Sequence, residues 1–277
     1  MINKNFHIFQ CNRIIKSLIT CILIVSALGA CYREPVNIDL SEFKNKLVVE
    51  GSIANHPGPH SVRITRTVRN HSRENMPPVS WAKVTIEDDL NNIYELTENR
   101  PGLYQVNMTG LPGRIYTLKI LSDGILYTAS SSMPQPLMLE SVKFVKQNAG
   151  SNHYSLSITF TDRAATSNFC KINVYKNGEL YDHYLYNDNL SDGQIMVLDD
   201  FDVRYNEVDL ATVELLTLNK DTYDYYASLD MIEDDDDSEV VNSFIPVSTY
   251  TPPTNLTNGA LGFFYAHSIH RYTGTVD

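Results

Sequence analysis

The stretch Ser155-Leu-Ser-Ile-Thr-Phe-Thr161 alternates apolar side chains with small polar ones. Successive side chains of a β-strand point to opposite faces of a sheet, so this pattern predicts a strand with one buried face. The same period of two recurs through much of the chain beyond Leu47. Four further segments that carry it are 62–65, 82–87, 104–108 and 116–120. The sequence therefore predicts a mostly β protein.

Turn residues separate these predicted strands at short intervals. They include Asn55-His-Pro-Gly58, Arg100-Pro-Gly102, Leu111-Pro-Gly113 and Ser122-Asp-Gly124. Short strands joined by Gly and Pro turns favour a β-sandwich. Met133-Pro-Gln-Pro136 interrupts the pattern, and proline cannot enter a central strand. We therefore predict two β-sandwich-type domains, an Ig-like one over 46–135 and a second β domain over 136–277.

One segment of the second predicted domain has a helical period instead. Its apolar face consists of Tyr225, Tyr226, Leu229 and Ile232. Asp221 can cap its first turn, so we predict a short helix near 221–232. The acidic run Glu233–Asp237 follows, and charge runs of this kind are typical of solvated loops. A calcium site in this run stays an open alternative, since it would need ligands from elsewhere in the chain.

The first 30 residues have the pattern of an export signal. They contain Lys4, Arg13 and Lys16 but no acidic residue, and an apolar stretch over 18–28 follows. That stretch is too short to cross a membrane, which takes roughly 20 helical residues. We predict a signal peptide over 1–30 that is cleaved from the chain. An ordinary secretory leader is the alternative to the more specific interpretation that follows.

Small residues and a cysteine stand at the end of this predicted leader. Leu28, Gly29 and Ala30 precede Cys31, and together they resemble the lipobox of bacterial lipoproteins. The resemblance implies that a signal peptidase recognises the three residues and that Cys31 carries acyl chains such as palmitate. Residues 31–45 would form a lipidated tether to a membrane. Tyr32 in place of Asp favours the outer membrane, while the choice between the periplasmic and the surface face stays open.

Charge and cysteine content narrow the range of functions. Removal of 30 residues from 277 leaves 247, and loss of three positive charges takes the net charge from −11 to −14. An acidic chain repels phosphates, so nucleic acid is not an expected partner. Cys170 would be the only free thiol of the mature chain. It alternates with Ile172 and Val174 against polar neighbours, which predicts a buried strand residue rather than a nucleophile.

Several stretches, in order along the chain, resemble a family of uncharacterised Bacteroidota outer-membrane lipoproteins, a domain of unknown function often encoded beside TonB-dependent receptors. They include Lys46-Leu-Val-Val-Glu-Gly-Ser-Ile53, Trp81-Ala-Lys-Val-Thr-Ile86, Asp221-Thr-Tyr-Asp-Tyr-Tyr226 and Asn258-Gly-Ala-Leu-Gly-Phe-Phe264. The second stretch also resembles the prealbumin-like or carboxypeptidase-regulatory-like sandwich. That likeness implies that Gly102 forms a tight turn and Tyr104 enters the core. Trp81 departs from it, because a small residue is usual there.

The sequence contains no catalytic or cofactor-binding motif that we could assign. It lacks a Gly-x-Ser-x-Gly elbow, a phosphate-binding Walker loop and a His-Glu-x-x-His helix. We therefore predict no enzyme activity and no cofactor. We also predict no metal site, because His267 and His270, the closest histidine pair, would face opposite sides of a strand. Tyr181, Tyr184 and Tyr186 are the candidate ligand or partner contacts. The alternative for these tyrosines is an ordinary place in the core and rim of a sheet.

Two functions are compatible with these features. The first is an outer-membrane lipoprotein that serves as a non-catalytic accessory or binding component of a TonB-dependent nutrient receptor. The second is a structural or adhesive surface lipoprotein that acts without a transporter. The sequence identifies no ligand for either.

Overall fold

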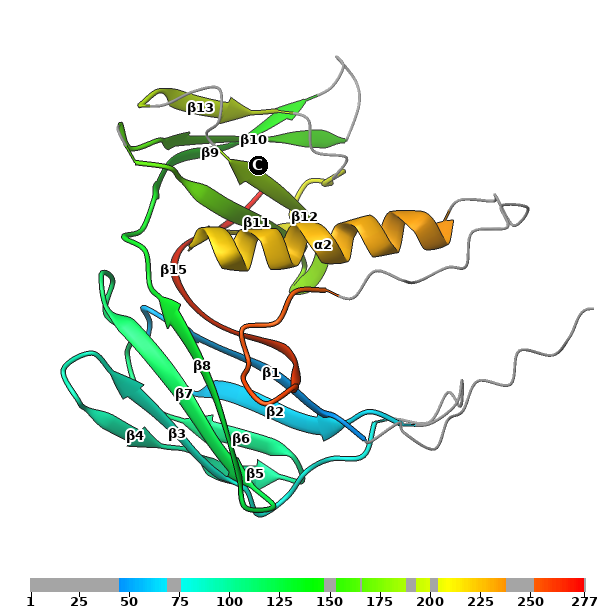
Figure 1. Cartoon of the computed structure of the whole chain (residues 1–277). Coiled ribbons are helices and arrows are strands. Elements are labelled where there is room, and N and C mark those ends of the chain that lie inside the picture. The colour runs from blue at the N-terminus through cyan, green and yellow to red at the C-terminus, as the bar shows by residue number, and fades with distance from the viewer. Residues whose placement is uncertain are drawn as a thin grey trace, which may run out of the picture. The chain divides into compact units, whose positions relative to one another are not determined.

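The computed structural model describes residues 45–68, 76–146, 153–164, 166–187, 193–199, 204–237 and 252–276, with the backbone alone over 232–237. The predicted signal peptide and almost all of the predicted tether lie outside this range. The described part is mostly β with one helix, as predicted (Figure 1). The elements in chain order are β1 (Leu47–Ala54), β2 (His60–Arg66), β3 (Lys83–Asp88), β4 (Ile93–Glu95), β5 (Thr97–Arg100), β6 (Leu103–Val106), β7 (Ile115–Ser122), β8 (Ile125–Ser132), β9 (Met138–Lys146), β10 (Tyr154–Thr161), β11 (Phe169–Lys176), β12 (Glu179–Asn187), β13 (Ile195–Leu198), β14 (Leu210–Leu218), α2 (Lys220–Asp237) and β15 (Leu261–Thr275).

The strands form three sheets. The largest has eight strands in the order β12-β11-β14-β15-β1-β2-β6-β5. A four-stranded sheet has the order β4-β3-β7-β8, and a three-stranded sheet has the order β13-β10-β9. All pairs are antiparallel except that of β1 with β15, which is parallel.

The four-stranded sheet packs against the β1-β2-β6 part of the large sheet. One hydrophobic cluster joins the inward residues of both layers, among them Val49, Ile64, Ile86 and Leu118. Two structural roles implied by the sandwich resemblance are confirmed here. Gly102 has a φ of +73°, which only a residue without Cβ adopts at little cost, and Tyr104 is almost fully buried.

A second hydrophobic cluster lies between the three-stranded sheet and strands β11 and β14. The buried face predicted for the strand over 155–161 is confirmed, because Leu156, Ile158 and Phe160 are fully buried in this cluster. Cys170 is buried in it as well and is a free thiol, as predicted. Burial raises the pKa of that thiol, since the charged thiolate loses its hydration.

Strand β15 joins the sheet regions of both clusters (Figure 1). Its first half pairs with β1, from Val48 with Leu261 to Ala54 with His267. Its second half pairs with β14, up to Leu210 with Thr275. The first cluster therefore contains residues from the end of the chain, including Leu256, Phe264 and Ala266. The domain boundary predicted at residue 136 stays a prediction.

The predicted helix exists, but its ends differ from the expectation. Asn219 caps it in place of Asp221, since the Asn219 Oδ1 accepts a hydrogen bond of 2.9 Å from the Thr222 backbone N–H. The helix also continues through Asp237, so the loop predicted for the acidic run is wrong. Within the described residues, no helix has the length and apolar character needed to cross a membrane.

Candidate functional site

The residues with a predicted role in processing cannot be placed. Leu28, Gly29, Ala30 and Cys31 all lie outside the described residues. Their roles as peptidase recognition sequence and lipid attachment site stay predictions.

The three candidate tyrosines lie on β12, but they do not form one surface. Tyr184 and Tyr186 lie opposite Ile172 and Cys170 in the sheet, and both pack against the second hydrophobic cluster. The Tyr186 ring meets the Phe160 ring edge to face, with centroids 5.6 Å apart. Only Tyr181 is well exposed, at 52 %. The structure thus favours a packing role for two of them, and their part in ligand contact stays a prediction.

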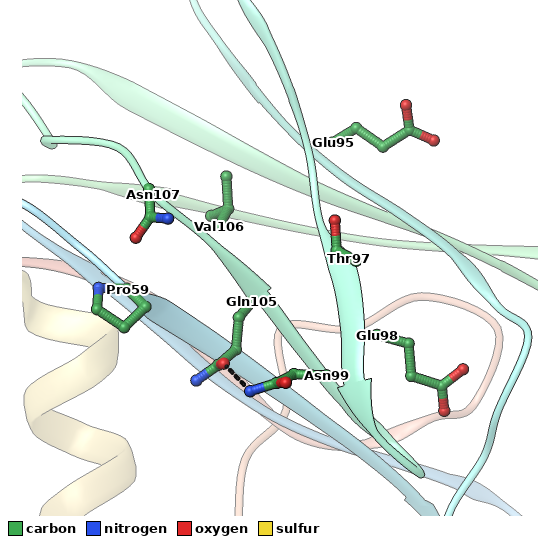
Figure 2. Close-up of a pocket in the computed structure, with 8 residues that line it drawn as sticks. All are labelled: Pro59, Glu95, Thr97, Glu98, Asn99, Gln105, Val106 and Asn107. Carbon is green, nitrogen blue, oxygen red and sulfur yellow. Dashed lines mark hydrogen bonds between the residues drawn. The ribbon is translucent and has the colours of Figure 1, made fainter.

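A more open surface lies along the edge strand β5. Two adjoining hollows of about 580 and 730 Å³ flank it and share Glu95, Thr97, Glu98 and Asn99. Figure 2 shows the Asn99 and Gln105 side chains facing one another on one side of β5, joined by a hydrogen bond of 2.7 Å. The Glu98 carboxylate points to the other side. We call these two hollows the β5 groove.

Glu98 organises the second hollow by holding a neighbouring loop. One carboxylate oxygen accepts the Trp81 backbone N–H at 3.1 Å, and the other accepts the Gly102 N–H at 3.0 Å. A hydrogen bond from the Ser80 side chain, followed by these two backbone bonds, lowers the pKa of Glu98. The carboxylate therefore stays charged at neutral pH, where its contacts are made.

The Tyr104 hydroxyl fixes the same loop from the inside. It accepts the Ala82 N–H at 3.0 Å and donates to the Val79 carbonyl at 2.9 Å. Burial raises the pKa of Tyr104, so the phenol keeps the proton that it donates. The loop from Val79 to Ala82 is thereby tied to β6 and, through Glu98, to β5.

Trp81 is the residue that this loop presents. Its side chain is 95 % exposed and lines the larger hollow of the β5 groove. Its φ of +64° is uncommon for a residue with a bulky side chain, and such conformations persist only where surrounding contacts hold them. Large aromatic side chains dominate recognition surfaces because they bring much apolar area and few flexible bonds. Trp81 and the β5 groove are therefore the candidate binding site.

Only a partial signal for this site is present in the sequence. Trp81 departs from the small residue expected in the sandwich resemblance, and that departure marked the position. Its exposure depends on hydrogen bonds that the Trp81 and Ala82 N–H groups donate to Glu98 and Tyr104, which lie 17 and 22 residues further along the chain from these donors. No local pattern predicts such contacts.

Three histidines lie close together beside β15, of which His60 and His267 are buried and His56 is exposed. The rings of His56 and His60 are 5.1 Å apart, and both raise the electrostatic cost of protonating His267. Burial first, and then these two neighbours, lower the pKa of His267 to about 3. In the described part of the chain, no three His, Cys, Asp or Glu side chains are placed to hold a metal ion. His270 does not face this group, because its Nδ1 accepts the Leu139 N–H at 2.9 Å.

Comparison with known proteins gives one result at the level of the family. No curated protein matches the sequence. A family model described as Domain of unknown function (DUF4249) matches residues 33–273, nearly all of the chain beyond the predicted leader. The chain belongs to this family.

Proposed function

We propose that the protein is an outer-membrane lipoprotein, anchored through acyl chains on Cys31, that serves as a non-catalytic binding component of a TonB-dependent nutrient receptor. The observation that carries the proposal is the sequence Leu28-Gly29-Ala30-Cys31 at the end of a basic and then apolar leader. The family match covers residues 33–273, so the predicted leader lies outside the matched residues.

The exposed surface of the described residues supports a binding role. Trp81 offers an aromatic face, and the β5 groove beside it provides amide and carboxylate groups. Ligand sites combine apolar contact area with a few oriented polar groups in this way. Tyr181 offers a second exposed aromatic side chain on β12. The association with a receptor comes from the family resemblance and is the part of the proposal that most needs a test.

Lipid attachment is tested first. Cells that express the wild-type chain or the Cys31→Ser variant are labelled with a palmitate analogue, and their membranes are fractionated. We expect label and outer-membrane location in the wild type, and loss of both in the variant. A variant that fractionates with the outer membrane unchanged would refute anchoring through Cys31.

Association with a receptor is tested second. The tagged wild-type protein is purified from detergent-solubilised outer membranes. The tagged Cys31→Ser protein is the matched control, because any receptor recovered with it must have bound after the cells were lysed. We expect a TonB-dependent receptor to co-purify with the wild type. If the lipidated protein is recovered without any receptor at all expression levels, the structural or adhesive alternative is favoured instead.

A further inference from the structure

Strand β1 begins at one end of the sandwich that the four-stranded sheet forms with β1, β2 and β6, which we call the N-terminal sandwich. Arg66 marks this end, because its guanidinium donates to the Asn45 carbonyl at 3.4 Å and forms an ion pair with Asp123. Asp123 lies in the turn between β7 and β8. The Lys46 N–H donates to the Thr67 hydroxyl at 2.9 Å, which ties the chain entry to the end of β2. We call this region, where the chain enters β1 beside the β7–β8 turn, the tether end.

Large apolar side chains gather at the tether end. Leu121, Ile125 and Leu126 flank the β7–β8 turn and are 45 %, 46 % and 50 % exposed. Leu121 pairs with Lys83, only two residues beyond the fully exposed Trp81. Met76, 48 % exposed, lies beside Thr65 near the end of β2, where the Thr65 hydroxyl meets its sulfur at 3.9 Å. Solvent-facing apolar groups that cluster in this way mark a surface that contacts another phase or partner.

Basic side chains surround this apolar set. Lys46, Lys83 and Arg100 are exposed, and Arg66 is half-buried. The acidic groups near them include Asp123, which pairs with Arg66, Glu98, which holds the Trp81 loop, and the exposed Glu95, which lines the same hollow as Trp81. The tether end is thus locally basic in a chain whose net charge is −11. Lysine and arginine near a bilayer attract lipid phosphates, and tryptophan favours the depth of the headgroups.

We propose that the tether end rests on the phospholipid surface of the membrane that holds the anchor, with Trp81 and the β7–β8 turn at the level of the headgroups. This proposal assigns Trp81 to lipid and leaves the polar residues of the β5 groove for a ligand. This inference rests on the proposed lipid at Cys31. Only the 14 residues from Cys31 through Lys44 separate that lipid from the first described residue, and they reach at most about 50 Å when fully extended. The chain enters the sandwich at this end, so the apolar set lies at the end nearest the anchor along the chain.

The opposite end of the sandwich provides the comparison. It also exposes apolar side chains, among them Leu90 and Ile93, each 67 % exposed beside the β3–β4 turn. Strand β7 begins at that end with Ile115 and finishes at the tether end with Ser122, so the two sets lie at opposite ends of the same sheet. Exposure alone therefore does not select the membrane-facing end. Three other features favour the tether end as the end that faces the membrane, namely the entry of the chain, Trp81 and the basic side chains.

Trp81 is the only tryptophan of the chain, so intrinsic fluorescence reports on the tether end directly. The purified lipidated protein is incorporated into phospholipid vesicles and compared with the Cys31→Ser protein in buffer. We expect its emission to move to shorter wavelength, to be quenched by lipids with a spin label near the headgroup, and to be shielded from iodide in the water. Emission and iodide quenching equal to those in buffer would overturn the inference.

Two variants and one separation complete the test. Combined Leu121→Ser, Ile125→Ser and Leu126→Ser substitutions should abolish most of the spectral shift, while Leu90→Ser with Ile93→Ser should retain it. Equal effects of the two variants would overturn the inference. Vesicle flotation separates the two proposals: a wild type that does not float overturns the lipid anchor and this inference together, while a floating protein with Trp81 in water overturns only the inference. A shift that appears only after a receptor is added would assign the surface to a protein and not to lipid.

Discussion

The substitution Gly262→Ala tests how strand β15 completes the N-terminal sandwich. Gly262 has a φ of +89° and lies opposite Val49 in the parallel pair of β1 with β15. A Cβ built on Gly262 would lie 2.0 Å from the Val49 carbonyl oxygen, where van der Waals contact needs more than 3 Å. The alanine methyl group therefore cannot be accommodated unless β1 and β15 move apart.

The expected cost has two parts. A non-glycine residue with a left-handed backbone costs roughly 1–2 kcal/mol. Separation of the strands by about 1 Å would also weaken one or two ladder hydrogen bonds, each worth about 1 kcal/mol, and loosen the packing of buried Phe264. The sum is a loss of about 3–5 kcal/mol in the free energy of unfolding, which is large for a single substitution. For a chain of this size, 4 kcal/mol lowers Tm by about 8–16 °C.

Gly259→Ala is the matched control. Gly259 also has a left-handed backbone, with a φ of +73°, but a Cβ there meets nothing within 4 Å. The control should therefore show only the backbone cost of roughly 1–2 kcal/mol. Both variants are measured by thermal and urea unfolding, followed by far-ultraviolet circular dichroism. If the two losses are equal, the close approach of β15 to β1 contributes nothing, and the reasoning fails.

Three further predictions concern single buried or hydrogen-bonded groups. Cys170→Ser should cost about 1–3 kcal/mol, because it places a more polar hydroxyl in an apolar cluster, and the wild-type thiol should react with a thiol reagent only after unfolding. His267 has a lowered pKa in the folded state, so its contribution to stability is complete above the ordinary pKa of about 6.5 and is lost as the pH falls toward 3, at up to about 1.4 kcal/mol per pH unit. Urea unfolding measured between pH 7 and pH 4 should show that the free energy of unfolding depends less on pH in His267→Leu than in the wild type. An equal dependence on pH in the two proteins would contradict this account. Glu98 also has a lowered pKa, so Glu98→Gln should lower the free energy of unfolding at pH 7. The variant and the wild type should be equally stable at a pH below the folded-state pKa of Glu98. If the variant stays less stable at acidic pH, the effect is steric and does not depend on the charge.

Local pattern was sufficient for much of the fold. The alternation of Leu156, Ile158 and Phe160 predicted a strand with one buried face, and Cys170 was placed correctly in the core. Gly102 and Tyr104 took the turn and core positions that the sandwich resemblance implied. Each of these properties depends on neighbours within a few residues, because the pleat of a strand and the φ of a turn are set locally. The helix was predicted for the same reason. Its ends were not predicted, because Asn219 caps it in place of Asp221 and because it continues through the acidic run to Asp237.

The candidate site required contacts that no local pattern contains. Tyr184 and Tyr186 pack against the second hydrophobic cluster because of the register of β12 on β11, and their part in ligand or partner contact stays a prediction. Trp81 departs from the residue type that the sandwich resemblance implies, but its exposure depends on hydrogen bonds from its loop to the distant Glu98 and Tyr104.

The sequence by itself was sufficient to predict that the described part of the chain forms strands with one buried face and contains one helix. Only the tertiary structure decided that β15 runs beside β1, with Gly262 against Val49 more than 200 residues away. It also decided that the exposed Trp81 shares one end of the sandwich with the entry of the chain. The physical reason is that side-chain alternation is fixed by the backbone geometry of adjacent residues, whereas strand order depends on which apolar faces bury one another across the whole chain.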